Sequence, residues 1–355
     1  MAHIWVRSEQ REFEQRVGVT PQGVSKLMDA GHKVTVEKST SRAIDISQYQ
    51  DTGCDIAPAH SWVDAPSDAI VFGLKELDED GPDLTHRHIM FGHAYKGQVE
   101  GPALLSRFKR GGGALYDLEY LLDENKRRIA AFGYWAGFAG AAVGVMAWLS
   151  QQNDQKLGKV GVYGNKDDLV AELEKGCQTA LNDGAEKPNV IIIGAKGRVG
   201  SGALELARSL GLQVSEWDMA ETAHGGPFPE ILEHTIFVNC ILASPNVPVF
   251  VPKSAVTSDR TLSVIADVSC DPNSPYNPVP VYDHSTSFAD PIIRVAGAPD
   301  YLDVMAIDNL PSMLPVESSQ DYAEQLLPYL LKLDNMDQGV WAGAYEFYKQ
   351  HSSEL

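Results

Sequence analysis

The sequence has few cysteines and little positive charge, and each shortage excludes a class of protein. The four cysteines, at positions 54, 177, 240 and 270, are far apart and form no CxxC pair, so neither a disulfide framework nor a thiolate zinc site is indicated. The 29 basic residues are outnumbered by 48 acidic ones, for a net charge of -19. Such a chain repels phosphate backbones and anionic membranes, and we expect no nucleic-acid partner.

A secretory signal is also missing. The first ten residues, MAHIWVRSEQ, include charged side chains from Arg7 onward and lack the apolar run of a secretory leader. Together with the isolated cysteines, this predicts a reducing, cytoplasmic location.

Only one run is long enough and uncharged enough to span a bilayer, IAAFGYWAGFAGAAVGVMAWL at 129–149. It is rich in glycine and alanine, whereas membrane insertion favours leucine and isoleucine. The small residues suit a helix that packs closely against a sheet or a second helix. We therefore expect a buried interdomain helix and no membrane span.

What the chain does contain is an alternation of strand and helix patterns. With 355 residues and 44% hydrophobic content, it is long enough for two domains with real cores. The first 130 residues predict strands at 3–8, 32–39, 69–74, 88–94 and 113–121 and helices at 20–31 and 101–113. Thr20 is expected to cap the first helix, with Pro21 in its first turn. This half is α/β.

The second half contains a glycine turn in the right context for a dinucleotide. An apolar strand in KPNVIIIGAKGRVGSGALELARSLGLQVSEWDM leads to Gly194, Gly197 and Gly200, then to an amphipathic helix, a second strand and Asp218. The spacing is GxxGxxG where the usual fingerprint is GxGxxG, and a glycine turn alone can be purely structural. The full pattern predicts that amides at the helix start hold a pyrophosphate and that Asp218 accepts hydrogen bonds from ribose hydroxyls. A carboxylate there selects NAD over NADP.

Further patterns place this nucleotide-binding unit in the middle of the chain. A helix at 167–183 precedes it, strands at 235–242 and 261–269 follow, and helices resume from about residue 318. We expect two Rossmann-like domains, each with a parallel twisted sheet: a substrate and catalytic domain, 1–131 plus 312–355, and an NAD-binding domain, 132–311. The active site is expected in the interdomain cleft.

Several motifs carry a family resemblance. EQRVGVTP, GLKE and FGHAYK before a central dinucleotide fold resemble the alanine dehydrogenase and transhydrogenase superfamily. Seven longer stretches in order, among them GALYDLEYL, GAKGRVGSGA and IDNLPSMLPVESS, are similar to NAD-dependent, lysine-forming saccharopine dehydrogenases over nearly the whole chain. The resemblance implies oxidation of saccharopine at its secondary amine, hydride transfer to NAD, and hydrolysis of the imine to lysine and 2-oxoglutarate.

The resemblance also implies roles for individual residues. Lys75 and His93 match the catalytic pair, and Glu76 and Glu119 match acidic residues that tune the site. The expected substrate-binding residues are Arg16, Lys75, Gln98, Arg128, Phe132, Ser269 and Asp271. The expected cofactor-binding residues are Arg127, Gly194, Gly197, Arg198, Gly200, Asp218, Thr222, Leu242, Val268, Ile307, Asp308, Asn309 and Leu310. By the same resemblance, the chain is expected to be a monomer that acts on a small molecule.

Alternatives remain open at this stage. An alanine dehydrogenase-like or other opine-type enzyme shares the hydride chemistry, although the presence of both Arg16 and Arg128 favours a larger acid. A non-catalytic NAD sensor is expected to lose Lys75 or His93, and both are present. The run HRHIMFGH could supply metal ligands, but no acid or cysteine completes a site, so His86 and His88 are expected at the surface and no metal is predicted.

Overall fold

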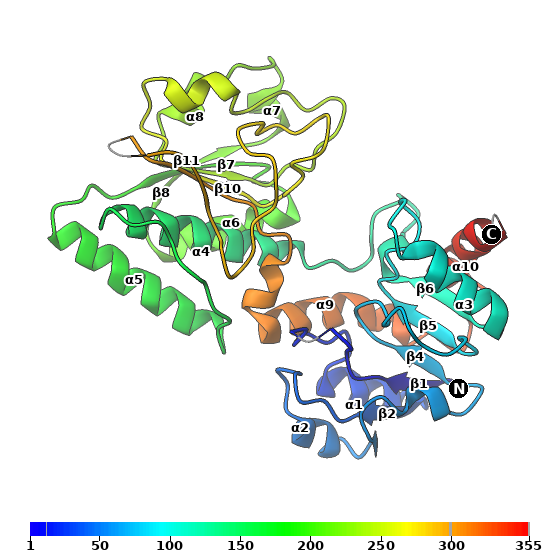
Figure 1. Cartoon of the computed structure of the whole chain (residues 1–355). Coiled ribbons are helices and arrows are strands. Elements are labelled where there is room, and N and C mark those ends of the chain that lie inside the picture. Colours follow the sequence, from blue (N-terminus) through cyan, green and yellow to red (C-terminus); the bar gives the residue numbers. More distant parts are fainter. Residues whose placement is uncertain (12, 298–299, 354–355) are drawn as a thin grey trace. The chain divides into compact units, whose positions relative to one another are not determined.

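The computed structural model describes residues 1–11, 13–297 and 300–353. The chain divides into two compact units (Figure 1). Unit 1 comprises residues 1–131 and 315–355, and unit 2 comprises residues 132–314. Each unit is described by itself.

Unit 1 is built on a sheet of six described strands, β1 (His3–Val6), β2 (Lys33–Glu37), β3 (Asp55–Ala57), β4 (Ile70–Phe72), β5 (Arg87–Met90) and β6 (Ala114–Asp117). Their order is β3-β2-β1-β4-β5-β6, and all adjacent pairs are parallel. In a parallel sheet every strand ends at the same edge. The segments after β1, β4, β5 and β6 therefore emerge together.

The helices of unit 1 come from both ends of the chain. They are α1 (Pro21–Asp29), α2 (Ile46–Gln50), α3 (Gly101–Gly111), α9 (Pro315–Leu330) and α10 (Gly339–Ser353), with short 3-10 turns η1 (Ser61–Asp64) and η2 (Leu118–Tyr120). The predicted Thr20 cap is confirmed, since its side chain accepts a hydrogen bond from the amide of Gly23. Trp341 of α10 and Tyr322 of α9 are buried, so the C-terminal segment completes the core that the first 131 residues begin.

Unit 2 has a second sheet of six described strands, β7 (Asn189–Ile193), β8 (Gln213–Trp217), β9 (Ile236–Asn239), β10 (Val264–Asp267), β11 (Ile293–Ala296) and β12 (Leu302–Met305). Their order is β11-β12-β10-β9-β7-β8. The predicted parallel sheet is confirmed for β12, β10, β9, β7 and β8, whereas β11, at one edge, runs antiparallel to β12. Only five residues separate β11 from β12 in the sequence, too few for the crossover that a parallel pair needs.

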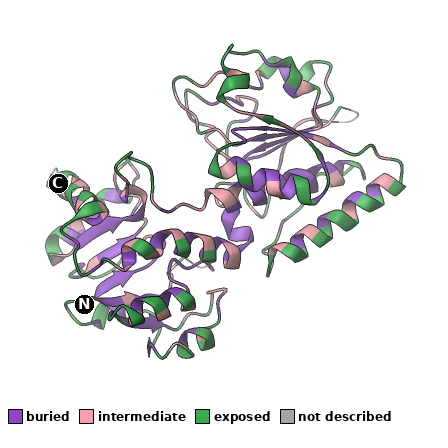
Figure 2. Ribbon diagram, turned by 180° about the vertical axis from the view of Figure 1, so that it is seen from behind, coloured by how far each residue is buried: buried purple, intermediate pink, exposed green. Residues whose placement is uncertain are grey.

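The central strands β7, β9 and β10 of unit 2 are buried on both faces, as expected for a sheet covered on each side, whereas the edge strands β8 and β11 are partly exposed. Val190 and Ile192 join a core cluster with α4 (Gly133–Gln151), α5 (Lys166–Asn182) and α6 (Arg198–Ser209). Ile191 and Ile193 point the other way, into a second cluster. That side carries the short helices α7 (Met219–Thr222) and α8 (Pro229–Leu232) and the turn η3 (Lys253–Thr257); η4 (Leu310–Met313) packs on α4. Figure 2 shows most strands of this sheet buried and α5 largely exposed.

The uncharged run at 129–149 forms α4, which is buried along nearly its whole length (Figure 2). It was predicted as an interdomain helix, but it packs against α6 and β10 within unit 2. Its glycines explain the composition: a Cβ on Gly137 would lie 1.8 Å from the carbonyl oxygen of Val199. Among the described residues, no helix is long and apolar enough to cross a membrane.

Candidate functional site

Lys75, Glu76 and His93 lie at the carboxyl edge of the unit 1 sheet. Lys75 and Glu76 follow β4, and His93 follows β5. The two segments remain paired beyond the strands, since the amide of Phe91 donates to the carbonyl of Leu74 at 2.8 Å. This edge is where open α/β sheets bind their ligands.

His93 and Glu76 form a direct pair. The Nδ1 atom of His93 lies 3.1 Å from Oε2 of Glu76, and Arg11 forms an ion pair with the other oxygen of Glu76. His93 has a positive φ of 46°, which is uncommon for a residue other than glycine and occurs often at functional sites. The hydrogen bond to Glu76 holds the Nδ1 edge of the imidazole ring, and 40% of the His93 side chain remains exposed.

The pair shifts both pKa values. The hydrogen bond that His93 donates to Glu76 raises the pKa of His93 above its ordinary value, against the opposing effect of burial. Burial works to raise the pKa of Glu76, but the hydrogen bond and charge of His93 and the charge of Arg11 outweigh it and lower this pKa to about 2. An ionised Glu76 therefore stabilises a protonated His93.

Two further acidic residues, Asp117 and Glu119, lie at the carboxyl edge of the unit 1 sheet. Asp117, at the end of β6, accepts hydrogen bonds from the amides of Gly92 (3.2 Å) and Glu119 (2.9 Å). Burial raises the pKa of Asp117 to about 6 despite these bonds. Glu119 forms an ion pair of 2.7 Å with Lys96, and the side chain of Gln98 accepts the amide of the same lysine at 2.7 Å.

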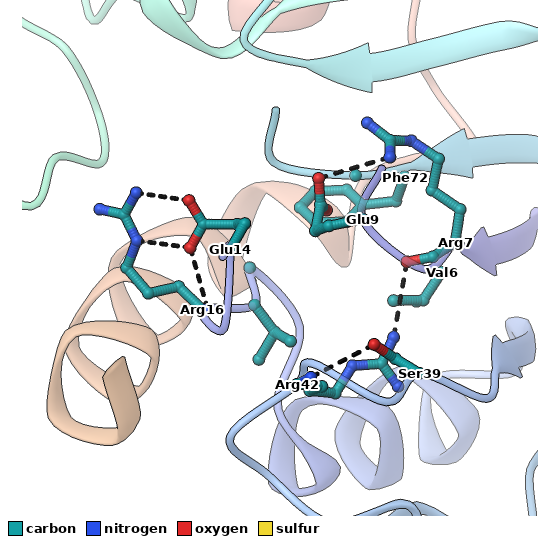
Figure 3. Close-up of a pocket in the computed structure, with 11 residues that line it drawn as sticks. Val6, Arg7, Glu9, Glu14, Arg16, Ser39, Arg42 and Phe72 are labelled. Atoms are coloured by element: carbon teal, nitrogen blue, oxygen red, sulfur yellow. Dashed lines mark hydrogen bonds and ion pairs between the residues drawn. The ribbon is translucent and has the colours of Figure 1, made fainter. Parts of the chain in front are cut away.

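Arg16 is held by a bidentate pair with Glu14. Its Nε and Nη2 atoms lie 2.8 and 2.7 Å from the two carboxylate oxygens, and both side chains are almost completely buried. Burial works to raise the pKa of Glu14, but the hydrogen bonds and charge of Arg16 outweigh it and lower that pKa. Figure 3 shows this pair beside a pocket that Arg7, Glu9 and Arg42 also line.

The other predicted arginines differ from Arg16 in exposure. Arg127 and Arg128 are both exposed. They lie on a turn that is closed by an antiparallel β-bridge between the backbones of Leu122 and Arg128. Phe132 is half-buried and caps α4 at its start.

In unit 2, the glycine turn joins β7 to α6 as predicted. Gly194 has a φ of 88°, which favours glycine. A Cβ on Gly200 would lie 2.2 Å from the carbonyl oxygen of Gly194, so glycine is needed for the helix to approach the turn. Gly197 caps α6 and Arg198 begins it, both exposed.

Asp218 lies at the carboxyl end of β8, beside this turn. Its carboxylate accepts the amides of Lys196 at 3.0 Å and Met219 at 2.8 Å, and the hydroxyl of Thr222 donates to its carbonyl. The strand, turn, helix and acid therefore meet at one point, as a dinucleotide site requires.

The remaining predicted residues of unit 2 lie in the loops that follow the strands. Leu242 is 74% exposed after β9, and Ser269 after β10 donates to the carbonyl of Ile241. Val268, Asp271 and Asn309 are half-buried, and Asp308 is exposed. Ile307 and Leu310 belong to the core, so any contact they make with a ligand would come from the backbone.

Comparison with known proteins gives close relatives over the full chain. The chain is 45% identical to the saccharopine dehydrogenase [NAD(+), L-lysine-forming] of Yarrowia lipolytica, over 98% of this chain and 97% of the relative. It is 42% identical to the enzyme of the same name from Schizosaccharomyces pombe, over 99% of both chains.

The chain belongs to the lysine-forming saccharopine dehydrogenase family. Residues 5–139 of the chain match the family model of the alanine dehydrogenase/PNT N-terminal domain, and residues 230–345 match that of the C-terminal domain. Among solved structures, an L-alanine dehydrogenase matches with a TM-score of 0.69 at 21% identity, covering 96% of this chain and 94% of that one. A Sinorhizobium meliloti transhydrogenase matches at 0.61 and 17%, covering 95% and 96%. These two likenesses concern the fold.

Sequence reasoning missed several residues of this saccharopine dehydrogenase-family chain. Arg11, Glu14 and Asp117 each contact or neighbour a predicted residue. Glu14 and Asp117 lie within the motifs EQRVGVTP and GALYDLEYL, which could have indicated them, whereas no quoted motif contains Arg11. The expectation for His86 and His88 is wrong: they are 4% and 0% exposed. They alternate onto one buried face of β5, where His88 packs edge-on against Trp62 and Phe108. The described residues contain no cluster of three potential metal ligands.

Proposed function

We propose that this chain catalyses the reversible, NAD-dependent conversion of saccharopine to L-lysine and 2-oxoglutarate. The observation that carries the proposal is the 42 to 45% identity to lysine-forming saccharopine dehydrogenases over nearly the entire chain. The geometry supports it independently, because unit 1 brings Lys75, Glu76 and His93 to one sheet edge and unit 2 has a glycine turn between a strand and a helix.

In the proposed reaction, Lys75 and His93 transfer protons. The secondary amine of saccharopine must lose a proton before its neighbouring carbon can give up a hydride, and water must then be activated to add to the resulting imine. We assign the amine proton to Lys75 and the water to His93. The pair of His93 with Glu76 supports this assignment, since a base oriented by a carboxylate is a recurring arrangement.

The residues of unit 2 fit NAD. A Cβ on Gly194 would meet the side chain of Ile241 and the backbone of Cys240, and one on Gly200 would meet the backbone of Gly194. The first amides of α6 have no acceptor within the helix, so they can hold a pyrophosphate. We assign Asp218 and Thr222 to the adenosine ribose, with Leu242, Val268 and residues 307–310 along the remainder of the site. NAD supplies the hydride acceptor.

Saccharopine has three carboxylates, and the proposed site provides guanidinium groups for them. Arg128 is exposed and available to a ligand, whereas Arg16 is already oriented by Glu14. We also assign Gln98, Phe132, Ser269 and Asp271 to the substrate. Unit 1 is then the catalytic domain and unit 2 the NAD-binding domain, and an active site between them remains a prediction.

We further propose that the protein is a cytoplasmic monomer. The four cysteines of the described structure are free, as a reducing compartment would keep them. Size-exclusion chromatography with light scattering would test the monomer, for which the expected mass is 38.7 kDa.

The function is tested by following NADH absorbance with purified protein, NAD and saccharopine, with alanine and other amino acids in parallel. With NAD present, absorbance should rise with saccharopine and not with alanine or the other amino acids. If alanine or another amine is oxidised instead, the same site acts on a different substrate. If no amine is oxidised, a non-catalytic NAD-binding protein is favoured.

A further inference from the structure

The segment that follows β1 runs alongside the segment that carries Lys75. The amide of Arg7 donates to the carbonyl of Phe72 at 2.9 Å, which extends the pairing of β1 with β4 by one residue. Beyond that point the backbone pairing ends, and side chains take over.

Glu9 contacts the backbone of Lys75 directly. Its Oε1 atom accepts the amide of Leu74 at 2.7 Å, and its Oε2 atom accepts the amide of Lys75 at 3.0 Å. Two amides bound to one carboxylate fix the orientation of the peptide between them, because both hydrogen bonds must point at the same group.

Arg7 completes the contact from the other side of the residue. Its Nη2 atom donates to the carbonyl of Lys75, and its Nη1 atom lies 3.3 Å from Oε2 of Glu9. The Arg7 side chain is completely buried and that of Glu9 is 8% exposed. Figure 3 shows the side chains of Arg7 and Glu9 facing each other, with Phe72 labelled beside them.

The sequence of the lysine segment is adapted to this contact. A Cβ on Gly73 would lie 2.4 Å from Nε and Cζ of Arg7, so any larger residue would displace the guanidinium. The glycine of the GLKE motif thus leaves room for the arginine that binds the lysine carbonyl.

We propose that Arg7 and Glu9 are positioning residues that fix the backbone of Lys75 at both its amide and its carbonyl, so that its amine is held toward the substrate. The proposal rests on the proposed function, since it assumes that Lys75 takes the substrate proton. A buried ion pair is a costly way to stabilise a fold, whereas a base must be held within a fraction of an ångström to act.

The test is a double-mutant cycle between Glu9 and Lys75 in the full-length protein. Glu9→Asp keeps the charge that pairs with Arg7 but shortens the reach to the two amides. We expect kcat with saccharopine to fall roughly 10- to 100-fold, while the NADH dissociation constant and the unfolding midpoint stay near wild type. Lys75→Met should lose roughly 10²- to 10⁴-fold, and adding Glu9→Asp to it should change the residual rate by less than about twofold.

Two further variants separate positioning from folding. Arg7→Lys keeps a cation beside Glu9 but loses the planar fork, and it should show the same non-additivity if Glu9→Asp folds poorly. Gln10→Ala is the matched control: Gln10 lies next to Glu9 and accepts the amide of Asp78 at 3.1 Å, and its loss should leave kcat unchanged.

The outcomes distinguish the two proposals. If wild type does not oxidise saccharopine, the proposed function fails. If wild type is active but the losses from Glu9→Asp and Arg7→Lys are the same with and without Lys75, or if neither variant lowers kcat, the positioning role is overturned and the proposed function stands.

Discussion

At the scale of single residues, the ion pair of His93 with Glu76 determines how both groups respond to pH. His93 has a raised pKa, so its contribution to stability is complete below its ordinary pKa of 6.5 and is lost as pH rises through the raised value. Glu76 has a lowered pKa, so its contribution is complete above 4.5 and is lost as pH falls toward about 2. The pair is therefore fully formed between 4.5 and 6.5.

Replacing Glu76 should release His93. In Glu76→Gln the carboxylate that stabilises the imidazolium is gone, so the pKa of His93 should fall toward its ordinary value or below it. Histidine NMR titration measures this, with the resonance assigned by His93→Gln. Asp83→Asn is the control, because Asp83 pairs with Arg110 and its loss should leave the titration unchanged. An unaltered titration in Glu76→Gln would contradict the pairing.

Asp218 should determine cofactor choice. In Asp218→Ala the ribose loses its acceptor and a 2′-phosphate no longer meets a carboxylate, so NAD affinity should fall and the preference over NADP should relax. The measurement is kcat/KM with both cofactors. Glu216→Ala is a matched control two residues earlier on β8, where the carboxylate pairs with Arg208. If Asp218→Ala keeps the wild-type ratio, Asp218 does not contact the ribose.

Sequence alone could indicate residues like these only where a local pattern marks them. Asp218 ends a strand after a glycine turn, and Lys75 follows an apolar run, so both stand out. Glu9 and Arg7 act on residues more than sixty positions away, and no spacing predicts that. The expectation of surface positions for His86 and His88 followed from the lack of an acid or cysteine to complete a metal site, but parallel strands covered on both faces bury whatever they carry.

At the scale of elements, the close crossing of α4 and α6 depends on glycine. Cβ atoms on Gly137 and Gly202 would each lie 1.8 Å from a carbonyl oxygen of the other helix. Gly137→Ala should therefore destabilise the protein by about 1–3 kcal/mol through overpacking, although alanine is the better helix former.

The control for this substitution lies in α10. Gly343 is exposed, and a Cβ there would meet nothing within 4 Å, so Gly343→Ala should stabilise by about 0.5–1 kcal/mol. Urea unfolding measures both. Equal effects at the two positions would mean that the helices can separate without cost.

The predicted elements agree with the structure where periodicity is strong. The helices α1, α3 and α5 were predicted close to their observed bounds, and α6 was predicted in its observed order between two strands. The short elements β3, α2 and β11 were missed, because three to five residues carry too little pattern to separate strand from loop. The antiparallel β11 depends on pairing with β12, which is tertiary information.

At the scale of the whole molecule, the two units differ in how the chain builds them. Both core clusters of unit 2 lie entirely between residues 135 and 314, so its sheet and covering helices come from one continuous segment. Unit 1 needs both ends of the chain, since Tyr322 and Trp341 are buried in it.

This difference predicts how fragments behave. A fragment of residues 132–314 should fold by itself, with one cooperative thermal transition, because it contains its complete core. It should also bind NADH, detected by nucleotide fluorescence, because the glycine turn and Asp218 both lie within it. The fragment 1–131 should show no cooperative transition, since α9 and α10 are absent and the surfaces they cover are exposed to water. Cooperative folding of 1–131, or failure of 132–314 to fold, would mean that the stability of the two units is not divided as their cores are.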